Sequence, residues 1–331
     1  MLDRKEGQSV KKKKKWIWII SGVVLILLII NFAAAFFFYN LAIERNVKDF
    51  LNDNDDLEVE AETLDILLEG DWRDWSDEQP FETWHQTSYD NFDLQGYYLE
   101  AEQPTNKVVI FAHGYLGHGK DMALYGQHYY EDLGYNIFTA DMRGHGESEG
   151  DYIGFGWHDR LDLLDWVDKI IERVGEDAEI VLHGVSMGGS SVLMASGEEL
   201  PPNVKAVVAD ASYTDVNDLF SYQIDRMFHL PSFPFIPSTS LVTQIRAGYG
   251  LKEASALDQV AKAEVPILYI HGKEDVFVPT EMTEELYENT KSEKELLLVD
   301  EASHGESFVK DEELYKETLD GFLERFVQKT D

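Results

Sequence analysis

Short apolar segments alternate with amphipathic ones along most of this chain, and the alternation restricts its fold more than any other feature. Six near-continuous apolar runs are expected to be strands, at residues 108–112, 136–140, 180–183, 204–209, 265–270 and 295–299. Helical patterns cover about residues 122–132, 157–173, 187–197, 280–289 and 308–328. Strands that are apolar on both faces and separated by helices predict a mostly parallel sheet covered by helices on both faces.

Two further strands precede this region. Residues 83–88 and 92–101 flank the turn Asp90-Asn91 and are expected to form an antiparallel entry to the sheet. The sequence therefore predicts an α/β fold with an eight-stranded, mostly parallel sheet. Trp72, Trp75 and Trp84 lie at the start of this domain, where packing is a more common use of tryptophan than a carbohydrate-binding surface.

One interval interrupts the alternation. More than 50 residues separate Asp210 from Pro266, which is too long for an ordinary crossover connection. The interval is rich in aromatic residues and proline, as in Phe233 to Pro237. We expect an inserted helical cap at about residues 212–262, which either encloses an apolar part of the substrate or packs onto the sheet.

The N-terminal segment predicts a membrane anchor. Residues 16–39 carry no charge and span roughly 36 Å at about 1.5 Å per helical residue. A cleaved signal peptide is the alternative, because Ala33-Ala34-Ala35 resembles a cleavage site. The apolar segment is longer than the usual apolar region of a signal peptide, so we favour an uncleaved signal anchor.

Charge asymmetry predicts the orientation of this anchor. Seven Lys and Arg residues precede the apolar segment, whereas the residues after it are mainly acidic. The N-terminus is therefore expected in the cytoplasm, and the folded domain outside the cell membrane. The expected organisation is a basic N-terminus (1–15), a transmembrane signal anchor (16–39), an acidic stalk and entry segment (40–80) and a folded domain (81–331).

Composition excludes several classes of partner and site. The chain has 63 acidic and 28 basic residues, and seven of the basic residues lie within the first 15. An acidic body repels phosphate groups, so we expect no nucleic acid partner and no close membrane contact beyond the anchor. The absence of cysteine excludes disulfides, a thiol nucleophile and cysteine metal sites.

A glycine-rich turn carries the first candidate catalytic residue. The segment Gly184-Val185-Ser186-Met187-Gly188-Gly189 lies directly between a predicted strand and a predicted helix. A sharp turn at this place requires glycine, because side chains would collide with the neighbouring strand and helix, and it leaves the serine hydroxyl exposed. Ser186 is therefore predicted to be a nucleophile, and the alternative is a chance glycine-rich turn.

A serine nucleophile needs a histidine to take its proton and a carboxylate to orient that histidine. Chemistry collects at the carboxyl ends of parallel strands, and His304 lies in the last loop between a predicted strand and a predicted helix. We therefore expect His304 to be the base. His113, His183 and His271 each adjoin a glycine at a strand end, where structural hydrogen bonds are the expected use.

The carboxylate is expected from a strand end between the serine and the histidine. Asp275 follows the strand at 265–270 and is the preferred candidate, with Glu274 and Asp210 as alternatives. The anionic intermediate of such a reaction needs backbone N–H donors. Met187 N–H, at the start of a helix, and Tyr115 N–H, in the loop after residues 108–112, are the expected donors.

These motifs together resemble the serine α/β-hydrolase superfamily over roughly residues 80–328. The resemblance rests on His113-Gly114, residues 141–148, the turn around Ser186, residues 271–279 and Ser303-His304-Gly305. More narrowly, the chain is similar to membrane-anchored or secreted hydrolases of Gram-positive bacteria. The resemblance implies an α/β-hydrolase fold, Ser186 as nucleophile, Asp275 as acid, His304 as base, and Tyr115 and Met187 as oxyanion donors. It also implies that Asp141 and His145 belong to a structural loop.

Serine at position 186 indicates acyl chemistry, since dehalogenases and epoxide hydrolases of this fold use an aspartate nucleophile. We expect cleavage of a carboxylic ester through an acyl-enzyme, with no metal or cofactor. The expected partners are a small-molecule or lipid-like acyl substrate and the lipid bilayer. An acyltransferase, a thioesterase or a peptidase would use the same residues, and a non-catalytic binding protein is the alternative from another class.

Overall fold

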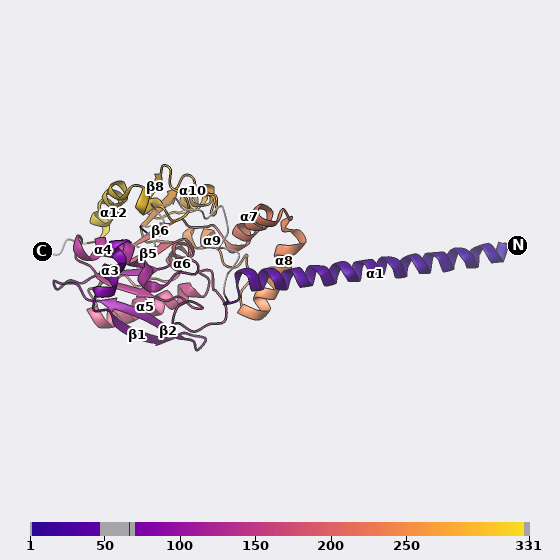
Figure 1. The fold of residues 1–331 in the computed structure, drawn as a ribbon, viewed down its shortest axis with the longest axis horizontal. Helices are drawn as coiled ribbons and strands as arrows, with labels where there is room; N and C mark the ends of the chain where they lie inside the picture. Colours follow the sequence, from indigo (N-terminus) through magenta and orange to yellow (C-terminus); the bar gives the residue numbers. More distant parts are fainter. Residues whose placement is uncertain (1, 47–65, 67–69, 328–331) are drawn as a thin grey trace.

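Eight strands form one sheet in the order β1-β2-β4-β3-β5-β6-β7-β8 (Figure 1). The computed structural model describes residues 2–46, 66 and 70–327. The strands are β1 (Glu82–Thr87), β2 (Asp93–Leu99), β3 (Lys107–Ala112), β4 (Asn136–Ala140), β5 (Glu179–Val185), β6 (Val204–Asp210), β7 (Ile267–Gly272) and β8 (Lys294–Val299). Strand β2 pairs antiparallel with β1 and β4, and every other pairing is parallel. The predicted eight-stranded, mostly parallel sheet is confirmed.

Helices cover both faces of the sheet because its central strands are apolar on both sides. Along β3, Val108 and Ile110 pack into one apolar core and Val109 and Phe111 into the other. The first core includes side chains of α5 (Asp159–Val174), α6 (Met187–Ser196) and α10 (Thr280–Asn289). The second includes side chains of α3 (Asp71–Glu78), α4 (Ala123–Glu131), α11 (Ser307–Lys310) and α12 (Glu312–Phe326).

Two helical details differ from the sequence expectations. The single helix expected at 308–328 is divided into α11 and α12, because Asp311 leaves the helical conformation and its side chain accepts a hydrogen bond from Leu314 N–H. Helix α3 was not predicted, and it places Trp72 in the second core. Burial of Trp72 agrees with a packing role for this tryptophan.

The cap interval contains three helices. They are α7 (Val216–Phe228), α8 (Ser232–Ala247) and α9 (Ala256–Val260). Figure 1 shows α7 and α8 at the end of the body from which the N-terminal helix projects. Ile224, Ile236 and Val242 of these helices are buried in the first core.

The N-terminal helix α1 (Leu2–Ala42) projects from the body (Figure 1). Its segment Lys14–Ala42 is long and apolar enough to cross a membrane, as a single-pass anchor or a signal sequence would be. The helix continues beyond the expected end of the span at Tyr39. Ala35, Tyr39 and Ile43 are buried in the first core.

The first residues of the expected stalk and entry segment (40–80) contact the folded domain. Ile43 C=O accepts a hydrogen bond from Ile153 N–H, and Glu44 forms a β-bridge with Tyr152. The Arg45 guanidinium donates to the backbone carbonyls of Gly146 and Ser148. The chain therefore joins the domain directly after α1. The rest of the expected stalk lies mostly outside the described residues, which omit 47–65 and 67–69.

Candidate active site

The turn between β5 and α6 holds Ser186 in a strained conformation. Ser186 has φ +56° and ψ −117°, a region that side chains other than glycine rarely adopt. A Cβ atom on Gly188 would lie 1.9 Å from the carbonyl oxygen of Ala112, and one on Gly184 would lie 2.2 Å from the carbonyl oxygen of Gly188. Both positions therefore require glycine, for the reason that the sequence motif suggests.

The structure brings Ser186, His304 and Asp275 into one hydrogen-bonded row. Ser186 Oγ lies 2.8 Å from His304 Nε2, and His304 Nδ1 lies 2.7 Å from Asp275 Oδ2. A carboxylate accepts only, so His304 Nδ1–H donates to Asp275, and neutral His304 accepts the Ser186 proton at Nε2. This row can move a proton from the serine to the histidine.

Asp275 is fixed from several sides. Its Oδ1 accepts hydrogen bonds from the backbone N–H groups of Phe277 and Val278, and its Oδ2 lies 3.0 Å from His271 Nε2. Burial alone would raise the pKa of Asp275, but the charge of His304 and the hydrogen bonds from His271 and His304 outweigh burial and lower it. Asp275 is thus held as a carboxylate. The contact from His271 was not foreseen, although the two residues are only four apart.

The other candidate carboxylates and histidines lie in different environments. Glu274 is exposed to solvent, whereas Asp210 is buried and accepts a hydrogen bond from Ser307 Oγ. Burial raises the pKa of Asp210 to about 6, despite the opposing charge of His271. His183 lies between the hydroxyls of Tyr129 and Tyr315.

A loop after β3 faces the turn at Ser186. Tyr115, the first expected oxyanion donor, lies in this loop, and Leu116 beside it has φ +61°. Met187, the second expected donor, is the first residue of α6, so its N–H has no acceptor within the helix and lies at the positive end of the helix dipole. Both residues line the same pocket as Ser186.

Segment 141–148 holds this loop through three hydrogen bonds. His145 Nε2 accepts from Leu116 N–H, Asp141 Oδ1 accepts from Gly119 N–H, and Met142 N–H donates to His113 Nε2. Burial lowers the pKa of His145 to about 3, so it stays neutral and can accept the hydrogen bond. Contacts of this kind agree with the structural role that the resemblance implies for Asp141 and His145.

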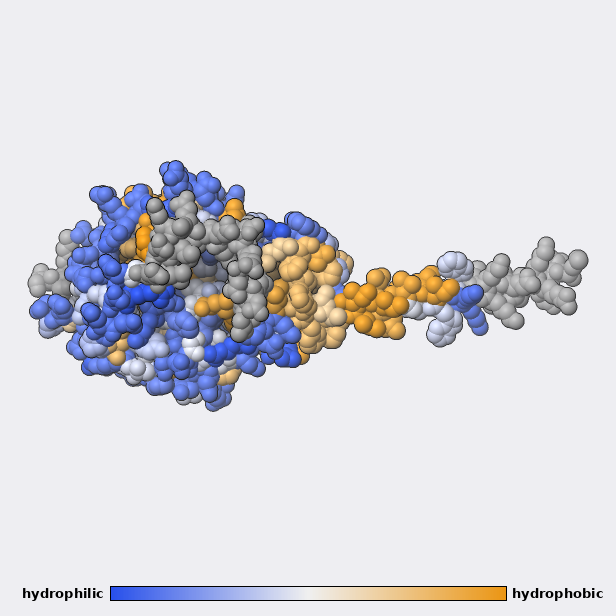
Figure 2. Space-filling model, viewed as in Figure 1, coloured by the Kyte–Doolittle hydropathy of each residue, from blue (hydrophilic) through white to orange (hydrophobic). Residues whose placement is uncertain are grey.

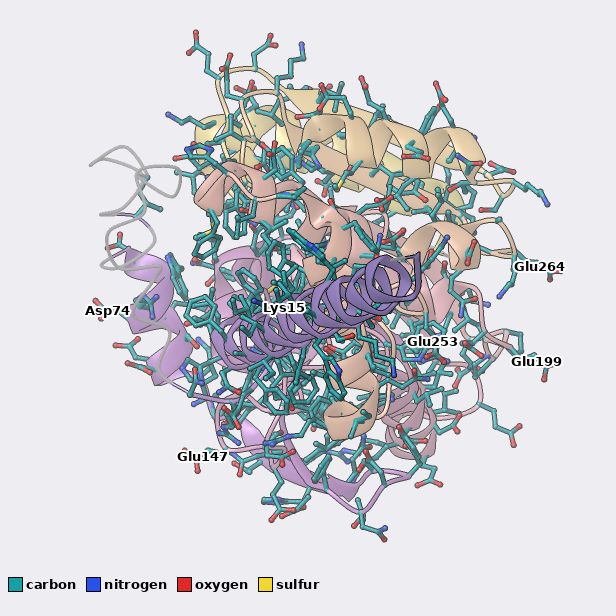
Figure 3. The ribbon with its side chains drawn as sticks, turned by 90° about the vertical axis from the view of Figure 1, so that its right-hand side faces the viewer. Lys15, Asp74, Glu147, Glu199, Glu253 and Glu264 are labelled. Carbon is teal, nitrogen blue, oxygen red and sulfur yellow. The ribbon has the colours of Figure 1, made fainter. Side chains whose placement is uncertain are left out.

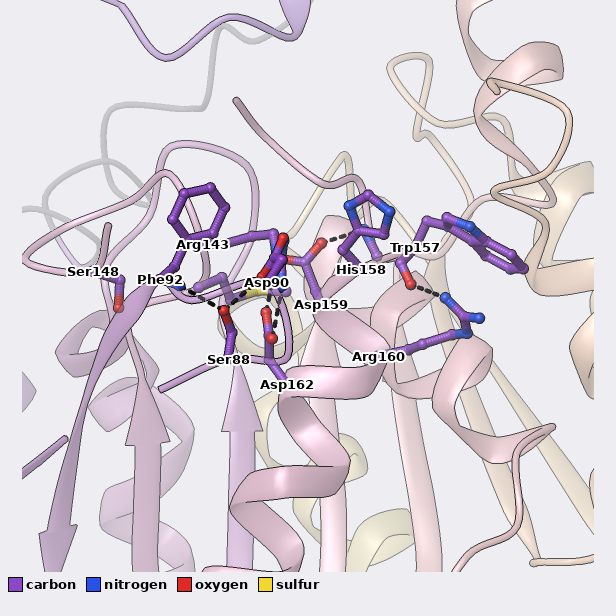
Figure 4. A network of polar contacts seen from close by, with 12 residues as sticks. Ser88, Asp90, Phe92, Arg143, Ser148, Trp157, His158, Asp159, Arg160 and Asp162 are labelled. Carbon is purple, nitrogen blue, oxygen red and sulfur yellow. Dashed lines mark hydrogen bonds and ion pairs between the residues drawn. The ribbon is translucent and has the colours of Figure 1, made fainter. Parts of the chain in front are cut away.

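A buried arginine anchors the same segment to the rest of the domain (Figure 4). The Arg143 guanidinium donates to both carboxylate oxygens of Asp162 on α5, to Asp90 in the turn between β1 and β2, and to the Tyr152 hydroxyl. Bidentate arginine–carboxylate pairs fix geometry as well as charge. Arg143 therefore fixes the segment that supports the oxyanion loop.

An apolar pocket opens at Ser186. It encloses about 790 Å³, its open mouth included. Its lining comprises Phe38, Leu41, Ala42, Tyr115, Phe155, Ser186, Met187, Tyr213, Leu219, Phe220, Gln223, Ile224, Met227, Phe228, Ile236, Phe277 and Val278. The cap helices α7 and α8 contribute one wall, as the sequence allowed. The last turn of α1 contributes another through Phe38, Leu41 and Ala42, which no sequence motif indicated.

The hydroxyl of Tyr115 connects this wall to the oxyanion loop. It donates to the carbonyl oxygen of Ala42 over 2.7 Å. Because Ala42 is the last residue of α1, its carbonyl has no partner within the helix, and the tyrosine supplies one. The end of α1 and the expected oxyanion loop are therefore hydrogen-bonded to each other.

Among the residues that the structure describes, no group of three or more His, Cys, Asp or Glu side chains could hold a metal ion.

The pH dependence of the reaction is expected to report His304. Burial disfavours the charged form of His304, but the Asp275 carboxylate outweighs burial and raises the pKa of His304 above the ordinary value of 6.5. The base must be neutral, so kcat/KM should rise with pH through a midpoint above about 6.5. Rates for a soluble p-nitrophenyl ester across pH check this. A midpoint at or below 6.5, or one that moves in the exposed-site control His85→Gln, would contradict it.

Relatives of this chain include enzymes and proteins of unassigned activity. A family model described as alpha/beta hydrolase fold matches residues 107–239. The chain is similar to the Uncharacterized protein YqkD of Bacillus subtilis, with 29% identity over 240 residues that cover 72% of this chain and 78% of YqkD. It is also similar to the lysophosphatidylserine lipase ABHD12 of Danio rerio, with 25% identity over 207 residues, 60% of this chain and 51% of that protein.

A solved structure is also similar. The esterase Pf2001 of Pyrococcus furiosus matches with a TM-score of 0.61 and 24% identity, over 77% of this chain and 96% of the esterase. Similarity at this level of sequence identity shows the fold but does not identify the substrate. Together, the family model and this neighbour support a hydrolase.

Proposed function

This chain has the α/β-hydrolase fold that its sequence predicts, and on that premise we propose that it is a membrane-tethered serine hydrolase that cleaves a carboxylic ester. The observation that carries the proposal is the row of contacts Ser186 Oγ to His304 Nε2 and His304 Nδ1 to Asp275 Oδ2. A nucleophile, a base and an orienting carboxylate within hydrogen-bond distance are what acyl transfer to serine requires.

In the proposed mechanism, Ser186 Oγ attacks the ester carbonyl carbon while its proton passes to His304 Nε2. The carbonyl oxygen becomes an oxyanion, which the N–H groups of Met187 and Tyr115 stabilise. The C–O bond to the alcohol then breaks, and His304 returns its proton to the departing alcohol. Water attacks the resulting acyl-enzyme in the same way, which releases the carboxylic acid and restores the Ser186 hydroxyl. Asp275 stays ionised and stabilises the His304 imidazolium.

An apolar acyl group fits the pocket better than a polar one. Phe155, Phe220, Met227 and Phe228 are among the apolar side chains that line it. An apolar cavity with a few polar groups at one end is the usual form of a site for an apolar ligand. The names of the similar proteins, an esterase and a lysophosphatidylserine lipase, support ester cleavage in the same direction.

The proposed location is the cell membrane, with α1 as a single uncleaved anchor. Its apolar segment has the required length, and the basic residues before it support a cytoplasmic N-terminus and an external catalytic domain. Protease treatment of intact cells tests the orientation. Protection of the catalytic domain would place it inside and reject this part of the proposal.

Ester cleavage is tested with the full-length enzyme on p-nitrophenyl esters from acetyl to dodecanoyl. Because the pocket is apolar and the cap helices form one of its walls, we expect kcat/KM to rise from acetyl toward medium acyl lengths. The p-nitroanilide and the thioester of the best acyl group serve as matched substrates. A larger kcat/KM for the anilide would favour a peptidase, and a larger value for the thioester would favour a thioesterase.

A further inference from the structure

Cap helix α8 presents an apolar stripe to its surroundings. Pro237, Leu241 and Ile245 follow one another at intervals of four residues along the helix, Phe233 precedes them at a kink with non-helical φ −91° and ψ +131°, and all four are exposed. Phe233 is 77% exposed and Ile245 73%, the two highest values for large apolar side chains outside α1 in the described part of the chain. A contiguous exposed apolar surface marks a binding surface, whereas isolated apolar residues do not. We refer to these four residues as the α8 stripe.

Helix α8 crosses α1 close to the body (Figure 1). In the first half of α8, Ser238 Oγ accepts a hydrogen bond from Asn31 Nδ2 over 2.6 Å. Pro234 shares a groove with Val24, Leu27, Leu28 and Asn31 of α1. At its C-terminal end, Arg246 forms an ion pair with Glu44 over 3.2 Å. The N-terminal end of α8 therefore lies farther from the body along α1 than its C-terminal end.

This position coincides with the depth of a bilayer. A hydrocarbon core of about 30 Å takes up about 20 helical residues, so a span that begins at Trp16 ends near Ala35. Asn31, and with it Ser238 and Pro234, then lies within the hydrocarbon core. Glu44 lies nine residues, or roughly 13 Å, beyond Ala35, so Glu44 and Arg246 lie outside the hydrocarbon core, on the side of the catalytic domain. The α8 stripe thus enters the acyl chains at its Phe233 end, whereas Ile245, next to Arg246, lies outside the hydrocarbon core.

The charge of this region permits such contact. Residues 226–252 contain no Asp or Glu, although the chain as a whole contains 63. Figure 3 shows acidic side chains such as Asp74, Glu199 and Glu264 directed outward elsewhere around the body. Figure 2 shows the corresponding apolar band where the body meets α1. The sequence analysis predicts no membrane contact beyond the anchor from the net negative charge of the whole body. That prediction does not apply to this face, because the net charge does not show that residues 226–252 lack acidic side chains.

The pocket reaches the same surface. Phe38 and Phe228 line the pocket, with ring centroids 5.3 Å apart. Phe228 also packs edge-on against Phe37, which is 52% exposed on α1. The rim of the pocket between α1 and α7 is therefore continuous with the apolar surface of α1.

We infer that the Phe233 end of the α8 stripe is immersed in the leaflet on the side of the catalytic domain, and that the substrate is a lipid ester whose acyl chain enters the pocket from this leaflet, between α1 and α7. The inference rests on the proposed serine hydrolase function and on α1 as a membrane span. It adds the substrate class and the route of entry. The acyl chain of a lipid would enter the pocket from the bilayer, whereas a water-soluble ester would enter the same pocket from the solvent.

The activity test uses the full-length enzyme in phosphatidylethanolamine and phosphatidylglycerol vesicles. Phe233→Glu and Ile245→Glu place a charge on the stripe without altering the pocket, since neither side chain lines it. We expect Phe233→Glu to lower hydrolysis of vesicle-embedded monooleoylglycerol at least about tenfold, because a carboxylate in hydrocarbon is costly, and Ile245→Glu, which lies outside the hydrocarbon core, to lower it less. Hydrolysis of soluble p-nitrophenyl butyrate should change less than about twofold, because the catalytic residues are untouched.

Leu314→Glu is the matched control. Leu314 is 38% exposed on α12, outside the cap and α1, and the variant receives the same charge. It should retain hydrolysis of both substrates. Equal loss of monooleoylglycerol hydrolysis in all three variants, or in none, would overturn the inference. A wild-type enzyme that hydrolyses neither ester would instead reject the proposed function.

A measurement of membrane depth tests the immersion of α8 separately from the hydrolase activity, since it needs no catalysis. The chain has no cysteine, so Phe233→Cys and Leu314→Cys each carry a single site for a fluorescent label. In vesicles that contain lipids with a nitroxide on the acyl chain, we expect strong quenching of the label at position 233 and little at position 314. Equal quenching at the two positions would overturn immersion of the α8 stripe, whatever the enzyme hydrolyses.

Discussion

Replacement of Ser186 by alanine is expected to lower kcat for a p-nitrophenyl ester by about 10⁶, the size of effect found when a serine nucleophile is removed from a catalytic triad. The loss is large because His304 then has no hydroxyl to deprotonate, and no acyl-enzyme forms. The variant should also fail to react with a fluorophosphonate probe. Steady-state kinetics and in-gel detection of the label measure the two effects on the full-length protein.

Ser191→Ala is a suitable control for this experiment. Ser191 lies on the same helix, is fully buried, and donates its hydroxyl hydrogen to the carbonyl oxygen of Met187. This variant should keep both the label and its activity to within a few-fold. If Ser186→Ala were labelled as strongly as the wild type, the nucleophile would be another residue. A wild-type protein that stays unlabelled would make a binding protein the better description.

Replacement of Asp275 by asparagine is expected to lower kcat by about 10⁴ with little change in the fold, as in the known case of a triad aspartate. The Asn amide keeps the shape of the side chain, but it can donate to His304 Nδ1. Donation at Nδ1 favours the tautomer with hydrogen on Nε2, which cannot accept the Ser186 proton. The raised pKa of His304 should also disappear, because the Asp275 carboxylate is its cause.

Glu274→Gln and Asp210→Asn complete this comparison. Glu274 is adjacent in sequence but exposed, and Asp210 is buried with Ser307 as its partner. Both variants should retain more activity than Asp275→Asn by at least about 10², because neither carboxylate contacts His304 directly. Near-normal activity of Asp275→Asn, with a large loss in either of the others, would transfer the role of the acid.

Local sequence patterns were sufficient to predict the eight-stranded sheet. Segments such as Asn136 to Ala140 are apolar enough to be buried on both faces, and this property belongs to a central parallel strand wherever it lies. The turn at Ser186 was predictable for a similar reason, since the close approach of backbone at Gly184 and Gly188 permits no side chain. Ser186, Asp275 and His304 each follow a strand end, and the carboxyl ends of parallel strands meet at one edge of the sheet, so sequence topology was sufficient to group them.

Contacts between distant segments were not predictable in this way. Phe36 to Tyr39 are apolar, and an apolar residue is equally compatible with lipid and with a protein core, so the sequence could not show that α1 ends inside the domain. The contact from His271 to Asp275 depends on the conformation of the loop after β7. The break at Asp311 depends on a single capping hydrogen bond, which a helical pattern does not reveal.

The last turn of α1 restricts which apolar helices could replace the N-terminal helix. An anchor that merely tethers can be replaced by any apolar helix of similar length, because lipid does not discriminate between such sequences. Here Ala35, Tyr39 and Ile43 belong to the core, and Phe38, Leu41 and Ala42 form part of the pocket. Under the proposed topology, a foreign anchor would therefore substitute only for the distal part of α1. Detachment of the helix by a protease would remove one wall of the pocket at Ser186 and would not release an intact soluble domain.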